Sequence, residues 1–224
     1  MTIFKVASAD IVDLPLQKYI ASTGKPVIVS VGMATIGEVE TVAEIYRKAQ
    51  NMNLILLHCV SNYPCEHESL NLSVMNTLRQ AFQVPVGYSD HSVGSEAASI
   101  SISLGAKVIE KHFTLDKNLP GPDHQASSTP EEFSELVSAV RRAEAMLGSP
   151  IKQCQEEEFQ MSQVSRKSLH LARRVQSGSL ISENDLVLMR PGTGLGIEHI
   201  SKFINKIAKN DFEKGYQINF FDVR

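Results

Sequence analysis

VPVGYSDH at residues 84–91 and KVIEKH at residues 107–112 are the two stretches that decide the fold. Each is an apolar run of strand length that ends in a histidine, and a helix-length segment separates the two. Consecutive strands of a parallel sheet place their carboxyl ends on one rim, so His91 and His112 are expected to lie close together there. Imidazole is a common ligand of first-row metals, and the pair predicts a divalent-metal site. The alternative is two polar residues hydrogen-bonded at a strand rim.

Similar apolar runs recur along the first two thirds of the chain, at residues 4–7, 27–31 and 54–59. Helical segments lie between the runs, and two of these begin with capping boxes, Thr35 with Glu38 and Thr129 with Glu132. Strand, helix, strand at this spacing predicts parallel βαβ units, five in all. A closed (β/α) barrel needs eight units in about 250 residues. The sheet is therefore either open or the C-terminal part of a longer barrel.

The texture of the sequence changes after Ser149. Residues 150–164 are polar and predict a linker, and residues 165–224 predict a small β-rich domain. Strands are expected at 169–172 and 186–189, with one helical turn at 182–185. A further helix is expected to carry Ile197, Ile200, Ile204 and Ile207.

Composition restricts the possible partners. The 224 residues are 42% hydrophobic with a net charge of -3, which argues for a folded protein and gives no reason to expect nucleic-acid or membrane binding. No apolar run approaches the roughly 20 residues of a membrane span. The three scattered cysteines favour a reduced, cytoplasmic setting.

Several charged residues are candidates for chemistry at the rim. Glu110 shares a strand face with His112 by the two-residue alternation, although it is alternatively a charge partner of Lys111 or Lys107. Lys5 near the end of the first strand suggests binding of phosphate or carboxylate, a Schiff-base lysine, or simply an edge lysine in water.

Other polar residues follow the strands or lie in loops. Hydroxyls at strand ends suit an oxyanion, and they belong to Ser8, Ser30, Ser61, Tyr63 and Ser89. Asp10 lies just beyond the first strand. The stiff loop LPGPDH at 119–124 presents Asp123 towards the rim or forms a plain turn. Arg190 offers a planar fork for an anion or carboxylate, unless it is a surface arginine.

The chain resembles the sialic acid synthases over essentially its whole length. The matching stretches are KVAS (5–8), GKPVIVSVGM (24–33), LLHCVSNYP (56–64), GYSDH (87–91), IEKHFT (109–114), PGPDH (120–124) and RPG (190–192). The resemblance implies a partial TIM barrel of about five of eight units (residues 1–149). A linker (150–164) and an antifreeze-like SAF domain of the β-clip type (165–224) follow, in a domain-swapped homodimer.

The resemblance also implies an activity and a site. The activity is condensation of phosphoenolpyruvate with an N-acetylated amino sugar such as N-acetylmannosamine, giving a nonulosonate and phosphate. His91 and His112 match ligands of Mn²⁺ or Mg²⁺, and Glu110 and Asp123 match acidic residues on the sugar and metal side. The phosphoenolpyruvate site is matched by Lys5, Ser8, Ser30, Ser61, Tyr63 and Ser89. Arg190 matches an arginine that the partner's SAF domain contributes to the sugar site.

The sequence departs from the family pattern in places. Asp10 stands where glutamate is frequent, and Val31 stands where threonine is usual. The family barrel begins well before Met1, with further binding residues on its first strands. Three hypotheses follow: a phosphoenolpyruvate-dependent synthase, a truncated inactive fragment or dimerising remnant, and a Schiff-base aldolase that uses Lys5.

Overall fold

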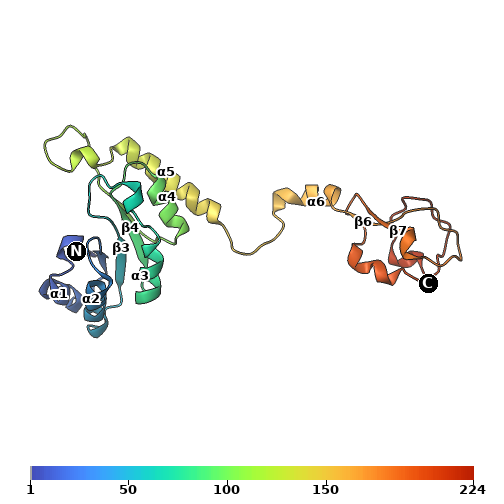
Figure 1. Cartoon of the computed structure of the whole chain (residues 1–224), viewed down its shortest axis with the longest axis horizontal. Helices are drawn as coiled ribbons and strands as arrows, with labels where there is room; N and C mark the ends of the chain where they lie inside the picture. Colours follow the sequence, from blue (N-terminus) through green and yellow to red (C-terminus); the bar gives the residue numbers. More distant parts are fainter. Residues whose placement is uncertain (1) are drawn as a thin grey trace. The chain divides into compact units, whose positions relative to one another are not determined.

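The computed structural model describes residues 2–224, which divide into two compact units, residues 1–148 and residues 149–224. Each unit is described by itself (Figure 1). The first holds a five-stranded parallel sheet with helices, and the second holds a two-stranded antiparallel sheet. The prediction of an α/β partial barrel followed by a small β-rich region is confirmed.

The strands of the first unit follow one another in spatial order. They are β1 (Phe4–Val6), β2 (Val27–Ser30), β3 (Leu54–His58), β4 (Val86–Asp90) and β5 (Ile109–Lys111). Every neighbouring pair is parallel. All five predicted strands are present, each within two residues of its expected bounds. The strands lie side by side in the same order as they occur along the chain. This is the strand order of a TIM barrel, so the sheet is part of one.

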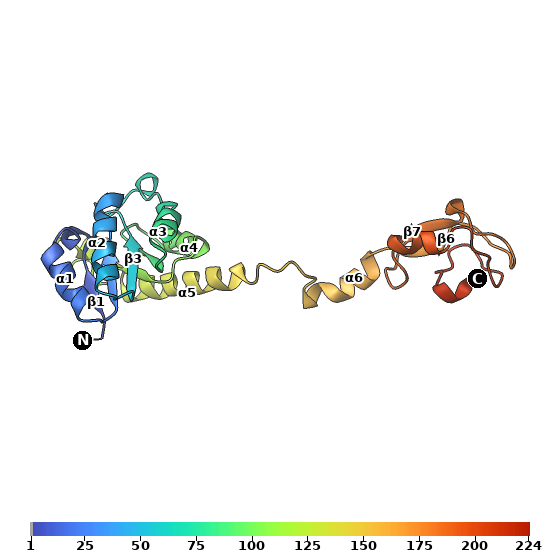
Figure 2. The ribbon, with the colours of Figure 1, turned by 90° about the horizontal axis from the view of Figure 1, so that it is seen from below.

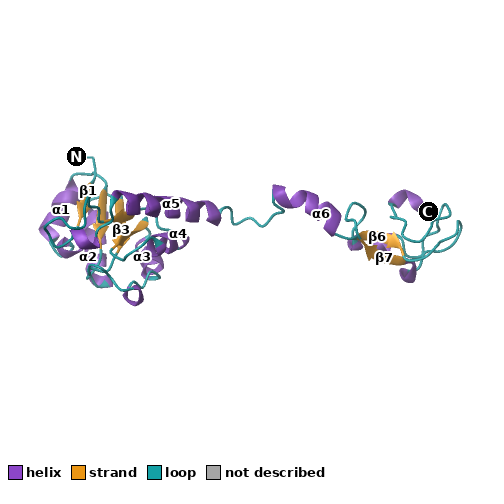
Figure 3. Cartoon of the chain, turned by 90° about the horizontal axis from the view of Figure 1, so that it is seen from above, coloured by secondary structure: helices purple, strands orange, loops and turns teal. Residues whose placement is uncertain are grey.

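Helices connect the strands on one side of this sheet (Figures 2 and 3). They are α1 (Leu14–Ser22), α2 (Ile36–Lys48), α3 (Val74–Phe82), α4 (Glu96–Ser103) and α5 (Pro130–Leu147). Both predicted capping boxes form, at Thr35 with Glu38 and at Thr129 with Glu132. Gly148 takes a positive φ of 51° at the end of α5, where the sequence predicts the helix to stop.

The core lies between the sheet and its helices. The strand residues in this core are Val6, Val27, Val29, Leu54, Leu56, Val86 and Tyr88. Because side chains alternate along a strand, the intervening residues project from the opposite, inner face. That inner face carries Lys5, Ser30, Ser89 and Glu110, so packing of the apolar face fixes where the polar residues point.

The second unit begins with α6 (Phe159–Ser165) and continues with the antiparallel strands β6 (Ser168–Leu171) and β7 (Leu186–Met189). The sequence predicts a linker through residue 164, whereas α6 occupies its second half. The isoleucine helix is also wrong in part. A 3₁₀ helix covers Ile197–Lys202, while Ile207 pairs with Leu180 in an isolated antiparallel bridge.

No helix among residues 2–224 is long and apolar enough to cross a membrane.

Candidate active site

The predicted site residues of the first unit come from the inner face of the sheet and from the loops at its carboxyl edge. Ser89 on β4 is the register partner of Glu110 on β5. Lys5 belongs to β1, at the other edge of the sheet. Barrel curvature brings the two edges into contact, because Lys5 Nζ lies 3.4 Å from Glu110 Oε2.

Glu110 is the centre of a connected polar network. Its Oε1 accepts a hydrogen bond from Ser89 Oγ at 2.8 Å, and Ser89 Oγ also lies 3.2 Å from His91 Nε2. Tyr63 OH lies 3.0 Å from the same nitrogen. The partner of Glu110 is therefore Lys5, not Lys107 or Lys111. Lys5 and Glu110 keep 35% and 37% of their side chains exposed, so a ligand can reach both.

The tautomer of His91 follows from its contacts. Its Nδ1 lies 2.7 Å from the Val60 carbonyl oxygen, which can only accept, so Nδ1 carries the proton. Nε2 then presents a lone pair towards the site, where the Tyr63 hydroxyl can donate to it, because the Ser89 proton goes to Glu110. Burial lowers the pKa of His91, and the neighbouring His112 lowers it further. A neutral imidazole held by a backbone carbonyl is the form that binds a metal.

The two histidines lie together, as the strand pattern predicts. Their ring centroids are 5.5 Å apart in an edge-on arrangement, and the Tyr63 ring lies 4.0 Å from His91 and 4.7 Å from His112. Among residues 2–224, no group of three or more His, Cys, Asp and Glu side chains is placed to hold one ion. The pair fits two nitrogen positions of a divalent ion, and water or substrate oxygens would have to supply the others.

Two serine hydroxyls lie close together near Gly32. Ser8 Oγ and Ser61 Oγ are 2.8 Å apart, and a Cβ added at Gly32 would clash with both side chains. Ser30 is 3% exposed, and its hydroxyl has no hydrogen-bond partner among the described residues. An unpartnered buried hydroxyl costs free energy unless a ligand or water satisfies it. The Ser30 hydroxyl is therefore available to a ligand.

Tyr63 bridges the histidines and the surrounding acidic residues. Burial raises the pKa of its phenol, and the Cys59 thiol and the Asp123 and Glu110 carboxylates add to that rise. The phenol therefore keeps its proton and can donate to His91. Asp123 itself is exposed and begins the 3₁₀ turn His124–Ala126, and only its backbone oxygen makes hydrogen bonds.

Two further predicted residues make other contacts. Asp10 is exposed after β1, and its backbone oxygen accepts from Gln17 Nε2 at 3.4 Å. Arg190 belongs to the second unit and donates from Nε to the Ser165 carbonyl at 3.0 Å.

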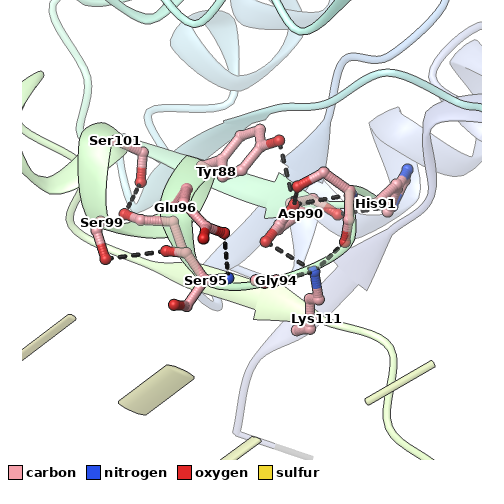
Figure 4. Close-up of polar contacts among 12 residues, drawn as sticks. Tyr88, Asp90, His91, Gly94, Ser95, Glu96, Ser99, Ser101 and Lys111 are labelled. Carbon is pink, nitrogen blue, oxygen red and sulfur yellow. Dashed lines mark hydrogen bonds and ion pairs between the residues drawn. The ribbon is translucent and has the colours of Figure 1, made fainter. Parts of the chain in front are cut away.

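The sequence reasoning missed a second charged pair on the same strands. Lys111 Nζ lies 2.9 Å from Asp90 Oδ2, with side-chain exposures of 4% and 0%. Figure 4 shows this pair beside His91 at the end of β4. The signal in the sequence was a residue of opposite charge directly before each histidine, Asp90 before His91 and Lys111 before His112.

The fold and this network define a class: a partial TIM barrel with a polar network at the carboxyl ends of its strands. The chain belongs to the NeuB family, whose model matches residues 1–152. Residues 166–224 match the SAF domain. The resemblance drawn from the sequence is thereby confirmed.

Three relatives illustrate the similarity. The N,N'-diacetyllegionaminic acid synthase of Legionella pneumophila is 44% identical over 94% of this chain and 60% of its own length. The crystal structure of N-acetylneuraminic acid synthetase from Leptospira borgpetersenii, in complex with citrate, is 39% identical over 72% of this chain and 56% of that one, with a TM-score of 0.67.

The third is the crystal structure of a putative spore coat polysaccharide biosynthesis protein E from Chromobacterium violaceum. It is 28% identical over 100% of this chain and 68% of that one, with a TM-score of 0.82. The chain spans 60–65% of the length of the first curated relatives that it matches.

Proposed function

We propose that this chain carries the phosphoenolpyruvate and metal site of a nonulosonate synthase. The reaction joins carbon 3 of phosphoenolpyruvate to the aldehyde carbon of an open-chain N-acetylated amino sugar. Water adds at carbon 2, and inorganic phosphate leaves. The observation that carries this proposal is the network of Lys5, Glu110, Ser89, His91 and Tyr63, which supplies a cation, a carboxylate and a neutral imidazole at one rim.

Lys5 and the surrounding hydroxyls would bind the anionic substrate. Lys5 Nζ is the cation of the network, Ser8 and Ser61 bring their hydroxyls together, and the buried Ser30 hydroxyl has no partner among the described residues. We assign the phosphate and carboxylate groups of phosphoenolpyruvate to these residues and to Ser89. Charge-assisted hydrogen bonds from a lysine and preorganised hydroxyls hold such groups without reorganisation.

Glu110 would handle protons during the reaction. Its two oxygens meet Ser89 and Lys5. An ionised carboxylate beside the reacting carbons can accept a proton from the water that adds at carbon 2. We assign Asp123 to the hydroxyls of the sugar, where an exposed carboxylate can accept hydrogen bonds. Asp10 would extend the sugar site from the β1 edge.

His91 and His112 would hold Mn²⁺ or Mg²⁺. A divalent ion bound there would supply Lewis-acid polarisation of a carbonyl oxygen. The residues contribute a neutral Nε2 on His91 and a hydroxyl on Tyr63 that keeps Nε2 oriented before binding. We place the reaction in the cytoplasm, in keeping with three free cysteines.

The test is release of inorganic phosphate from phosphoenolpyruvate in the presence of MnCl₂ and N-acetylmannosamine or a diacetamido hexose. Turnover of about 1 per second or more would support the synthase and contradict the fragment hypothesis. Lys5→Met and Glu110→Gln should each lower it by about 10²–10⁴-fold. Lys48→Met and Glu40→Gln, on the exposed surface of α2, serve as matched controls.

Two other outcomes identify the competing hypotheses. A Schiff-base aldolase would be trapped on Lys5 by borohydride with pyruvate and would tolerate chelators. An inactive fragment would release no phosphate although folded.

We extend the proposal to a domain-swapped homodimer in which Arg190 of a second copy reaches the sugar. Arg190→Ala and Glu110→Gln proteins should each be inactive, and mixing them should restore part of the activity. Recovery requires that the two residues act from different chains. A mixture as inactive as its components would contradict the swapped arrangement.

A further inference from the structure

The buried pair Asp90–Lys111 crosslinks the ends of β4 and β5 one residue away from each candidate metal ligand. Asp90 precedes His91, and Lys111 precedes His112. The two charged residues are register partners and point to the helix side of the sheet, while the histidines project from the inner face. Figure 4 shows Lys111 reaching across to Asp90 beneath the turn that carries Gly94.

The Asp90 carboxylate accepts hydrogen bonds from several neighbours besides Lys111. Asp90 Oδ1 accepts from the Ser92 amide at 2.9 Å, the Ser92 hydroxyl at 2.7 Å and Tyr88 OH at 3.3 Å. Lys111 donates to Asp90 and to the carbonyl oxygens of Ser92 and Gly94. The residues on both sides of His91 are therefore fixed by the same ion pair.

The His112 ring is held less directly than the His91 ring. The His91 ring is held by Val60 and its backbone carbonyl accepts from the Cys65 amide at 2.9 Å. The backbone carbonyl of His112 accepts from the Ser128 amide at 2.9 Å, and its ring contacts Tyr63 and His91. Two side-chain links join the strands just before the histidines: the Ser89–Glu110 hydrogen bond on the inner face and the Asp90–Lys111 ion pair on the helix face.

We propose that Asp90 and Lys111 are positioning residues that hold the imidazoles of His91 and His112 at the separation one divalent ion requires. The inference rests on the metal site of the proposed function. Fixed spacing matters because a metal ion tolerates only small changes in ligand distance, and outer partners of ligands typically contribute about 10–100-fold to metal affinity.

The experiment measures Mn²⁺ binding by the full chain, from the electron paramagnetic resonance signal of free Mn²⁺ during titration with MnCl₂. Asp90→Asn should weaken binding by about 10–100-fold. The double variant Asp90→Asn/Lys111→Met removes both charges, so it should regain much of the resistance to urea while its Mn²⁺ affinity stays low. A purely structural role predicts that stability and affinity recover together.

Two controls keep the test decisive where a single charge deletion prevents folding. Ser92→Ala removes one hydrogen bond to Asp90 without leaving a buried charge, and we expect affinity to fall a few-fold, roughly 2–10-fold. Tyr46→Phe breaks the buried hydrogen bond to Gln17 (3.0 Å) elsewhere in the core and should lower stability without changing Mn²⁺ affinity.

The inference is overturned if the double variant and Ser92→Ala bind Mn²⁺ as the parent chain does, or if the parent chain binds none. Its failure is distinct from failure of the proposed function. If Mn²⁺ binds and responds to Asp90→Asn while no phosphate is ever released, the positioning role stands and the synthase assignment falls.

Discussion

The sheet of the first unit carries one lysine–carboxylate contact on each face, and the two contacts differ in distance and in exposure. On the inner face, Glu110 meets Lys5 at 3.4 Å, and both side chains are more than a third exposed. On the helix face, Asp90 meets Lys111 at 2.9 Å with almost no exposure. The open pair can exchange its partner for a substrate, whereas the sealed pair can only hold the strands.

The difference teaches how one alternating stretch serves two purposes. In the segments SDH (89–91) and EKH (110–112), the first and third residues face the site and the middle residue faces the helices. Moving either strand by one residue would exchange the faces, so the site residues would turn towards the helices and the Asp90–Lys111 pair towards the site. Register is therefore as much a requirement of the site as the identity of its residues.

The largest expected effect comes from breaking the sealed pair. Lys111→Met leaves Asp90 ionised, buried and without its cation, and we expect the free energy of unfolding to fall by about 3–5 kcal/mol. Urea unfolding followed by circular dichroism measures this, since the chain contains no tryptophan. A loss below about 1 kcal/mol would show that water reaches the pair and that the contrast between the faces is wrong.

Adding a methyl group at Gly32 is expected to have the next largest effect. In Gly32→Ala the new Cβ would clash with Ser61 Oγ and would lie 2.6 Å from Ser8 Cβ. Such overpacking costs about 1–3 kcal/mol. We also expect phosphoenolpyruvate to lose its ability to raise the urea midpoint, because the methyl group displaces the Ser8 and Ser61 hydroxyls.

Gly37→Ala in the first turn of α2 is the matched control. A Cβ there meets nothing within 4 Å, and alanine favours a helix over glycine by about 1 kcal/mol or less. Protection by phosphoenolpyruvate should be unchanged. Equal behaviour of the two alanine variants would argue against an anion site at Gly32.

His58 gives the helix face a pH dependence. Burial lowers its pKa, although its Nε2 bonds the Leu70 carbonyl at 2.7 Å. The unfolded chain therefore binds a proton more readily than the folded one. Stability should fall as pH drops through the unfolded value near 6.5, until the lower folded pKa is passed.

Urea midpoints between pH 8 and pH 5 measure this dependence. His58→Gln should flatten the curve, while His67→Gln, at an exposed 3₁₀ turn, should leave it as it is. A curve unaffected by His58→Gln would assign the pH dependence to other groups.

The strands of the barrel wall could be predicted because each is a short apolar run. The starts of α2 and α5 could be predicted from their capping boxes. The sequence also brought Lys5, Ser89, Glu110, His91 and His112 to one rim. Isolated bridges such as Leu180 with Ile207 carry no periodicity, so the second unit was harder to predict. Asp123 and Arg190 lie outside the strands, so the alternation of side chains along a strand does not predict where their side chains point.

The sealed pair was missed for a related reason. The helix face of a barrel strand is expected to be apolar, and Lys111 was considered only as a charge partner of Glu110. Only facing register reveals that Asp90 and Lys111 neutralise each other. Pairing between strands is a long-range property that one sequence does not display.

The smallest expected change in stability, and the sharpest contrast with Lys111, belongs to Lys5→Met. The Lys5–Glu110 pair is partly exposed, so we expect the free energy of unfolding to change by only about 0–1 kcal/mol. The same substitution should sharply weaken protection of the folded chain by phosphoenolpyruvate, because it removes the cation of the anion site. Parallel urea titrations of Lys5→Met and Lys111→Met, with and without phosphoenolpyruvate, measure both quantities. If Lys5→Met destabilised the chain as much as Lys111→Met, both pairs would be structural and the inner face would lose its claim to bind substrate.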